Sequence, residues 1–311
     1  MFTRITTRAL AGVAVLGLAG ALAACSSGDP LAGETNEPGD TTAITIGSQG
    51  FAESDILAQL YGQVLAANGY DVEYAAGIGS RETFIPALQD GSIDLIPDYS
   101  GNLLYGLDSG ATATSSEDVD AALPDVVAEN GLAVAESAEA QDADALVVTP
   151  EFAAANNLTS IGDLKPIAGD ITIGANTEFE GRPYGRAGLE SVYGVTGWKF
   201  KAIDDYGGPG TLSDLLANNI QVADIYTTTP SIKQNKLVVL EDPEHLIAAQ
   251  NIVPLFNSSF GNDDFAAILN SVSEKLTTDE LLGLNEISAG DDKPSPEQVA
   301  KDWLTEQGLL K

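Results

Sequence analysis

The sequence contains few of the residues on which most catalytic and metal sites depend. Its 311 residues include one cysteine, Cys25, and one histidine, His245. A single cysteine excludes a disulfide within the chain. One imidazole, with no Gly-x-Ser-x-Gly turn in the sequence, gives no basis for a histidine-activated nucleophile, and a zinc site built on these two residues would lack ligands. We therefore expect no enzymatic activity, no bound metal and no cofactor.

Positive charge is also scarce. The chain has 14 lysines and arginines against 46 aspartates and glutamates, which gives a formal net charge of -32. Binding to nucleic acid requires clustered basic side chains that displace counterions, so this class of partner is excluded. An acidic surface instead favours solubility and cationic partners. The hydrophobic content of 44% is enough to form a core.

The chain begins with an apolar segment that follows two arginines, Arg4 and Arg8. The segment is too short and too rich in Ala and Gly for a permanent membrane span, and it reads as a secretory signal. It closes with Leu22-Ala23-Ala24-Cys25, which resembles a bacterial lipobox, where the chain is cut before a cysteine that is then diacylated. We predict a signal peptide at 1–24, a lipidated Cys25 and a Gly- and Pro-rich flexible tether over 25–42. The protein is then extracytoplasmic and held at the cell membrane by its lipid.

Short β-type runs and helical periods alternate from residue 43 onward. The predicted strands lie at 43–47, 71–74, 93–96, 132–134, 145–148, 171–174, 222–226 and 237–240. The predicted helices lie at about 56–65, 82–89, 119–129, 183–193 and 212–218. The sequence past Pro254 turns helical, with capping boxes predicted at Thr277-x-x-Glu280 and at Ser295-Pro296-Glu297-Gln298. Strands separated by single helices favour a parallel, doubly wound α/β sheet. A body of about 270 residues exceeds one usual α/β core, which indicates two lobes.

Two motifs of the chain are informative about its family. They are Ile44-Thr45-Ile46-Gly47-Ser48-Gln49-Gly50-Phe51-Ala52-Glu53-Ser54 and Gly91-Ser92-Ile93-Asp94-Leu95-Ile96-Pro97-Asp98-Tyr99-Ser100-Gly101-Asn102. Together they resemble the glycine betaine/choline/carnitine-binding proteins of osmoprotectant ABC importers. The resemblance implies a type II periplasmic-binding-protein fold, in which two doubly wound lobes are joined by two crossover hinges. It implies crossovers near 142–150 and 248–256. Lobe I then comprises 43–149 and the return segment with C-terminal helices, 249–311, and lobe II comprises 150–248.

The resemblance also implies an aromatic site for the solute. A quaternary ammonium donates no conventional hydrogen bond, so ring faces must hold it by cation–π attraction, worth about 0.5 to 2 kcal/mol per ring. Tyr99 and Tyr226 stand at two family cage positions, one in each lobe. Without the motif, each tyrosine would be read as ordinary packing.

Other positions depart from the family pattern. Asp144 stands where the family often has a cage tyrosine, and Gln250 and Asn251 stand near another. Half of the aromatic cage is therefore missing. A carboxylate would attract a cation by about 3 to 4 kcal/mol at ~4 to 5 Å in an effective dielectric near 20, before desolvation is counted. The alternative is that Asp144 caps a turn at the hinge.

The family positions for a solute carboxylate are Gln49, Asn102 and Arg182. Arg182 can pair with a carboxylate in bidentate geometry, or it pairs with Glu178 or another surface acid instead. Some family members have lysine where this chain has Gln49. The missing lysine and the added Asp144 favour choline-like or other cationic solutes over carboxylated betaines.

The resulting hypothesis is a monomeric, lipid-anchored solute-binding protein that captures a small cationic or zwitterionic solute of the choline or glycine betaine type and delivers it to an ABC permease. Three alternatives stay open. The solute is another cationic amine, the chain is a secreted lipoprotein enzyme that uses paired carboxylates, or it is a sensory lipoprotein that engages a receptor.

Overall fold

The computed structural model describes residues 43–310. The predicted signal peptide, the lipidated Cys25 and the tether lie outside the described residues. Within the described part, no helix is both long enough and apolar enough to cross a membrane.

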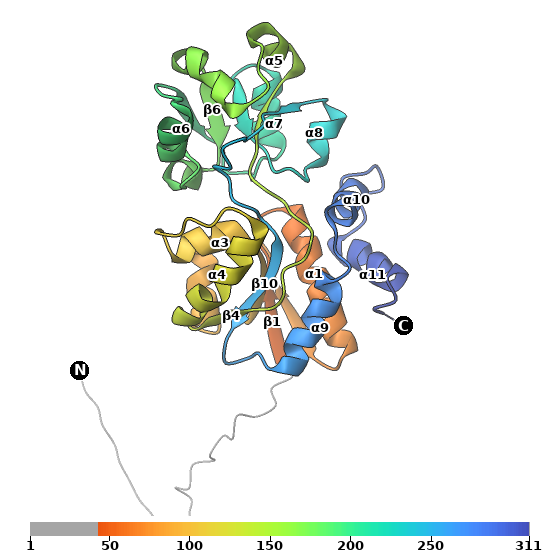
Figure 1. Ribbon diagram of the computed structural model, residues 1–311. Coiled ribbons are helices and arrows are strands. Elements are labelled where there is room, and N and C mark those ends of the chain that lie inside the picture. The colour runs from red at the N-terminus through yellow and green to blue at the C-terminus, as the bar shows by residue number, and fades with distance from the viewer. Residues whose placement is uncertain (1–42, 311) are drawn as a thin grey trace, which may run out of the picture. The chain divides into compact units, whose positions relative to one another are not determined.

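The first lobe is built on a five-stranded sheet in the order β2-β1-β3-β10-β4 (Figure 1). Its strands are β1 (Ala43–Gly47), β2 (Asp71–Ala75), β3 (Leu95–Tyr99), β4 (Leu132–Val134) and β10 (Ile252–Asn257). Strand β1 pairs parallel with β2 and β3, whereas β10 pairs antiparallel with β3 and β4. Because helices cover both faces, the central strand β3 is buried along its whole length.

Two groups of helices cover the two faces of this sheet. The lobe contains α1 (Ala52–Ala67), α2 (Arg81–Gln89), α3 (Ser100–Leu107), α4 (Ser116–Glu129), α9 (Asp263–Ser273), α10 (Thr278–Ser288) and α11 (Pro296–Glu306). Side chains of α1, α9, α10 and α11 form one core cluster with the sheet, and those of α2, α3 and α4 form the other. The cap half of each predicted capping box is confirmed, since the Thr277 and Ser295 side chains each accept a hydrogen bond from the backbone amide three residues later.

The second lobe contains another five-stranded sheet, in the order β7-β6-β8-β5-β9. Its strands are β5 (Leu146–Val148), β6 (Thr172–Ala175), β7 (Lys199–Ala202), β8 (Val222–Asp224) and β9 (Val238–Val239). Its helices are α5 (Pro150–Asn156), η1 (Ile161–Asp170), η2 (Thr177–Gly181), α6 (Arg186–Tyr193), α7 (Pro209–Leu216) and α8 (Pro230–Gln234). Figure 1 shows α5, α6, α7 and α8 grouped around this sheet. Strand β6 pairs parallel with β7 and β8, and β5 pairs antiparallel with β8 and β9.

The chain changes lobe twice, and the two crossover segments lie side by side (Figure 1). The first runs over 135–145 and the second over 240–251, and Gln141 bridges to Asn251 in antiparallel register. Strand β5 pairs only within the second sheet, so the first change of lobe is complete before residue 146, whereas the sequence analysis extended lobe I to 149. The second crossover contains the predicted boundary at 248.

The α/β architecture with two lobes is confirmed, but the predicted all-parallel order is wrong. Each sheet is mixed because the strand that enters it after a crossover runs against its neighbours. The prediction of helix past Pro254 missed β10, and helix begins only at Asp263. Proline normally demotes a strand prediction because it lacks a backbone N–H. Here Pro254 faces Pro97 across the β3–β10 ladder, so the two missing donors fall at one paired position.

Candidate ligand-binding site

The candidate site is a narrow space between the lobes, which we call the slot. It consists of two adjoining cavities of about 30 Å³ each. The residues that line both are Gln49, Arg81, Asn102, Asp144 and Tyr226. Several follow the carboxyl ends of parallel strands, namely Gln49 after β1 and Tyr226 after β8, which is where open α/β sheets present ligand sites.

Aromatic rings from both lobes form one wall of the slot. Phe51, at the start of α1, stacks on Tyr206 of the second lobe with centroids 5.3 Å apart, and it contacts Tyr226 edge-on at 5.6 Å. The Tyr99 ring lies 6.1 Å from the same phenyl ring. The two predicted tyrosines thus line one cavity, with Phe51 in contact with both. A ring attracts a cation through its negatively polarised face, so the ring faces turned toward the slot can hold one.

A group of negative side chains faces the second lobe's part of the slot. Asp144, in the first crossover, accepts a hydrogen bond from Asn102 Nδ2 at 2.8 Å. Asp224, at the end of β8, is buried beside it. Burial first, and the charge of Asp144 second, raise the pKa of Asp224 well above its usual value. Burial and the same two carboxylates also raise the pKa of Tyr226, so its phenol stays protonated.

The two arginines of the slot are each paired with an acid. Arg81 Nε lies 3.0 Å from Asp98 Oδ2 and its Nη2 lies 2.5 Å from Oδ1, a bidentate pair that also receives the Gln49 Nε2 donor at 3.3 Å. Arg182 forms an ion pair with Glu82 on α2, 3.1 Å apart, which joins the two lobes. Of the two partners expected for Arg182, a solute carboxylate or a surface acid, the structure shows the acid, which is Glu82. Burial raises the pKa of Asp98 despite the neighbouring guanidinium.

Glu53 connects the lobes beside the aromatic wall. Its carboxyl group accepts hydrogen bonds from Tyr99 Oη at 2.8 Å, from Thr228 Oγ1 at 2.5 Å and from Asn285 Nδ2 at 2.5 Å. Burial raises its pKa, and these three hydrogen bonds oppose the shift. Asp142 lies next to Glu53, and burial followed by the charge of Glu53 raises the pKa of Asp142 well above its usual value. Tyr99 is therefore fixed at its hydroxyl while its ring contacts Phe51.

Two predicted site residues lie outside the slot. Gln250 is fully buried, and its Oε1 accepts from the Asn102 backbone amide at 3.0 Å. Asn251 donates to the Ala138 backbone oxygen at 2.8 Å and accepts from Ser116 Oγ at 2.8 Å. Both side chains hold the crossovers against α3 and α4 and line neither cavity of the slot.

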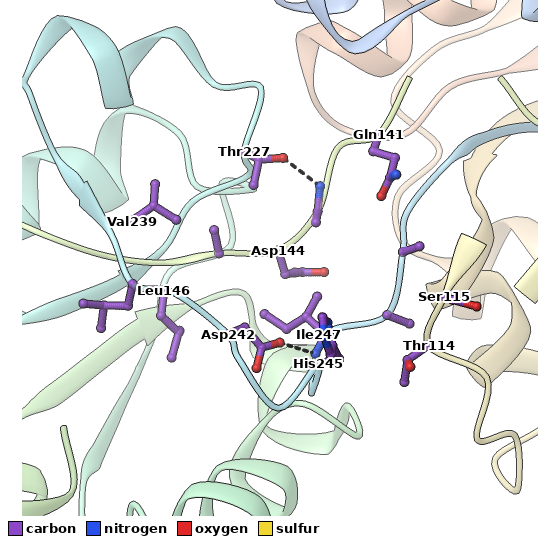
Figure 2. Close-up of a pocket in the computed structure, with 15 residues that line it drawn as sticks. Thr114, Ser115, Gln141, Asp144, Leu146, Thr227, Val239, Asp242, His245 and Ile247 are labelled. Carbon is purple, nitrogen blue, oxygen red and sulfur yellow. Dashed lines mark hydrogen bonds between the residues drawn. The ribbon is translucent and has the colours of Figure 1, made fainter. Parts of the chain in front are cut away.

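A larger cavity of about 460 Å³ lies at the crossovers, and we call it the hinge cavity (Figure 2). Its walls include Leu146, Val239 and Ile247, and its polar lining includes Asp242 and His245. Asp144 lines both the hinge cavity and the slot, and in Figure 2 it stands between Thr227 and Ile247. The hinge cavity is larger, but the aromatic rings and the arginines lie on the slot, so the slot is the candidate site.

Sequence reasoning missed several residues of the slot. They are Phe51, Arg81, Asn176, Tyr184, Tyr206 and Asp224. Phe51 lies inside the first of the two sequence motifs, and Asp224 lies two residues before Tyr226. Their proximity to predicted site residues was the sequence signal that could have identified them. Tyr206 lies in an Asp-Tyr-Gly-Gly loop with φ of 57°, which only the fold places beside Phe51.

No metal site accompanies the slot in the described part of the chain. Among residues 43–310, no group of three or more His, Cys, Asp or Glu side chains could hold a metal ion. The arrangement of rings, carboxylates and paired arginines suits reversible binding of a small charged organic molecule.

Known proteins resemble this chain over almost all of the described residues. A curated relative, the glycine betaine-binding protein YehZ of Escherichia coli (strain K12), is 23% identical over 280 residues, which are 86% of this chain and 92% of the relative. A solved structure described as a glycine betaine/carnitine/choline ABC transporter has a TM-score of 0.68 at 19% identity, with 86% of this chain and 100% of that chain covered. An ABC-transporter choline-binding protein in complex with choline has a TM-score of 0.63 at 13% identity, with 88% and 91% covered.

These structural matches establish the fold that the sequence resemblance implied. The family model described as the substrate-binding domain of ABC-type glycine betaine transport systems matches residues 42–306. The match spans both lobes and every residue that lines the slot. The family predicted from the two sequence motifs is therefore confirmed, and the chain belongs to the substrate-binding domains of ABC-type glycine betaine transport systems.

Proposed function

We propose that this protein captures a small quaternary ammonium or related cationic solute in the slot and delivers it to an ABC permease. The observation that carries the proposal is the cluster of Phe51, Tyr99, Tyr206 and Tyr226, which brings rings from both lobes to one place beside the Asp144 carboxylate. Ring faces attract a cation without needing a hydrogen-bond donor from it. A carboxylate adds attraction for any cation.

Closure of the lobes over the solute follows from the same arrangement. Each half of the slot carries only part of the lining, so a solute gains all its contacts only when the lobes are together. Two cavities of about 30 Å³ hold little more than water. A solute as large as choline therefore requires the lobes to separate on entry, or Phe51 to move, before they close on it.

The proposal includes the setting predicted from sequence. The protein is extracytoplasmic and monomeric, with diacylated Cys25 as its membrane anchor and residues 25–42 as tether. A lipid anchor of this kind would keep the binding body close to a permease in the same membrane. Globomycin-type inhibition of lipoprotein processing, with detection of an uncleaved precursor, tests the anchor.

The test of binding is calorimetry on the purified protein with choline, glycine betaine, carnitine, proline betaine and ergothioneine, preceded by a thermal-shift screen. We expect at least one of these cations to bind. Tyr226→Ala and Tyr99→Ala should each weaken that binding at least about tenfold, because each removes one ring worth about 0.5 to 2 kcal/mol and opens the slot to water. Tyr226→Phe is the matched control, since it keeps the ring and should stay within about threefold of the wild type. If both alanine variants bind as the wild type does, the slot is not the site.

A further inference from the structure

We infer that the solute of the slot carries at least one hydrogen-bond donor, which Asp224 and Asn102 receive. This inference rests on the proposed function and names its substrate class more narrowly, as a cation with an O–H or N–H group and not a fully substituted betaine. It starts from two acceptor atoms that the protein leaves without partners.

The first acceptor belongs to Asp224. The residue is 5% exposed, and its Oδ1 has no hydrogen-bond partner. Its carboxyl group lines the slot next to Asp144. A buried carboxyl oxygen without a donor is costly in either protonation state, because it has lost its hydration and has no hydrogen bond in its place. A donor from a solute in the slot would restore the missing hydrogen bond.

The second acceptor belongs to Asn102 on the opposite lobe. Its Nδ2 donates to Asp144 Oδ2 at 2.8 Å, and this contact fixes the orientation of the amide because a carboxylate only accepts. The amide oxygen is then turned away from Asp144, and it is buried without a partner. Asn102 lines both cavities of the slot. The protein thus presents unpaired acceptors from both lobes.

The cationic side chains of the slot each have an acidic partner within the protein. Arg81 is paired with Asp98, Arg182 with Glu82, and the Gln49 side-chain amide donates to Asp98. The two unpaired atoms of the slot are both acceptors, and each lacks a donor. Water can supply the missing donors to an open slot, but a solute that displaces this water must supply them in its place.

A methylated series on the wild-type protein tests this inference directly. Choline has a quaternary ammonium and one O–H donor. Its methyl ether, (2-methoxyethyl)trimethylammonium, has the same charge and head group but no donor, whereas N,N-dimethylethanolamine has an N–H donor in place of one methyl group. We expect choline and N,N-dimethylethanolamine each to bind at least about tenfold more tightly than the ether in calorimetry, because the ether leaves a buried acceptor without a hydrogen bond.

A variant separates the donor from the size of the added methyl group. Asp224→Leu replaces both carboxyl oxygens by methyl groups, so the ratio of choline to ether affinity should fall at least about threefold from its wild-type value, whereas a steric effect would persist in the variant. Asp125→Leu, at an exposed aspartate on α4, is the matched control and should keep the wild-type ratio. If Asp224→Leu fails to fold, as a melting curve would reveal, the wild-type series still decides.

Two results overturn the inference, and they differ in what else they overturn. If the ether binds as tightly as choline and N,N-dimethylethanolamine, the solute needs no donor, while capture of a quaternary cation stands. If no cation in the series or in the screen above binds, the proposed function fails and this inference fails with it. If Asp224→Leu keeps the full wild-type preference for the donors, that result would also contradict the role of Asp224.

Discussion

The Arg81–Asp98 pair shows how a residue of the slot also supports the fold. Asp98 has no exposed side-chain surface and the Arg81 side chain is 11% exposed, so the ion pair is almost fully desolvated. Arg81→Met would leave the Asp98 carboxylate buried without its main partner. We expect a loss of about 3 to 5 kcal/mol in the free energy of unfolding, measured by urea titration.

Two further variants control this prediction. Arg81→Met combined with Asp98→Leu removes both charges, and it should recover most of the loss because an apolar pair can replace a buried ion pair. Lys233→Met breaks the exposed Lys233–Glu286 pair and should cost about 0 to 1 kcal/mol. An equal loss for Arg81→Met and Lys233→Met would show that the buried pair contributes no more than a surface pair.

At the residue scale, sequence reasoning found positions close to motifs and failed where side-chain direction decides. Six of the predicted site residues line the slot, namely Tyr99, Tyr226, Asp144, Asn102, Gln49 and Arg182. Gln250 and Asn251 belong to the second crossover, as predicted, but their side chains turn toward α3 and α4. The crossover is extended backbone, and its sequence does not indicate which of its side chains face the slot. The aromatic partners Phe51 and Tyr206 are far apart in sequence and meet only through the fold.

At the element scale, helix α3 owes its position to a glycine. A Cβ at Gly101 would lie 2.5 Å from the Ala249 backbone oxygen and 2.9 Å from Ala248 Cβ, so the second crossover can lie against the helix only because no side chain intervenes. Gly101→Ala must push the crossover or α3 aside. We expect a destabilisation of about 1 to 3 kcal/mol in urea unfolding. Because Asn102 follows directly, solute affinity should fall as well.

Gly106→Ala is the matched control on the same helix. A Cβ there would meet Arg81 Cδ at 3.5 Å, an ordinary contact, and alanine favours helix over glycine by up to about 1 kcal/mol. We expect this variant to be as stable as the wild type or slightly more stable. If Gly101→Ala is equally well tolerated, the close approach of the crossover does not constrain the helix.

Elements with local signals were predictable, and elements defined by distant partners were not. The caps at Thr277 and Ser295 depend on residues three positions apart, and both were found. Strand β10 depends on β3 and β4, more than a hundred residues earlier, and Pro254 argued against it. The predicted lobe boundary at 149 falls after β5 because a distant pairing decides here too. Only the pairing of β5 with β8 and β9 assigns β5 to the second lobe.

At the scale of the whole molecule, buried carboxyl groups join the lobes. Glu53 of the first lobe accepts from Thr228 of the second at 2.5 Å, and Asp142 in the first crossover accepts from the Thr228 backbone amide at 2.9 Å. Burial raises the pKa of both carboxyl groups, and the charge of Glu53 raises the pKa of Asp142 further. The ionisable groups that face Asp142 are Glu53, Asp224, Tyr99 and Tyr226. The contact between the lobes is therefore most stable when the buried carboxyl groups are protonated.

This arrangement predicts that the protein without solute loses stability as the pH rises above about 4, the usual pKa of a carboxyl group in the unfolded chain. A carboxyl whose folded pKa is raised binds its proton more tightly in the folded state, so its contribution is fully present below its unfolded pKa and is lost as the pH passes the folded pKa. Asp142→Asn removes one such group and keeps the Oδ1 acceptor for Thr228. Its unfolding free energy should therefore fall less steeply with pH, by up to about 1.4 kcal/mol per pH unit. Asp125→Asn should keep the wild-type slope, and parallel slopes for Asp142→Asn and the wild type in urea titrations would contradict a shared proton at the interface.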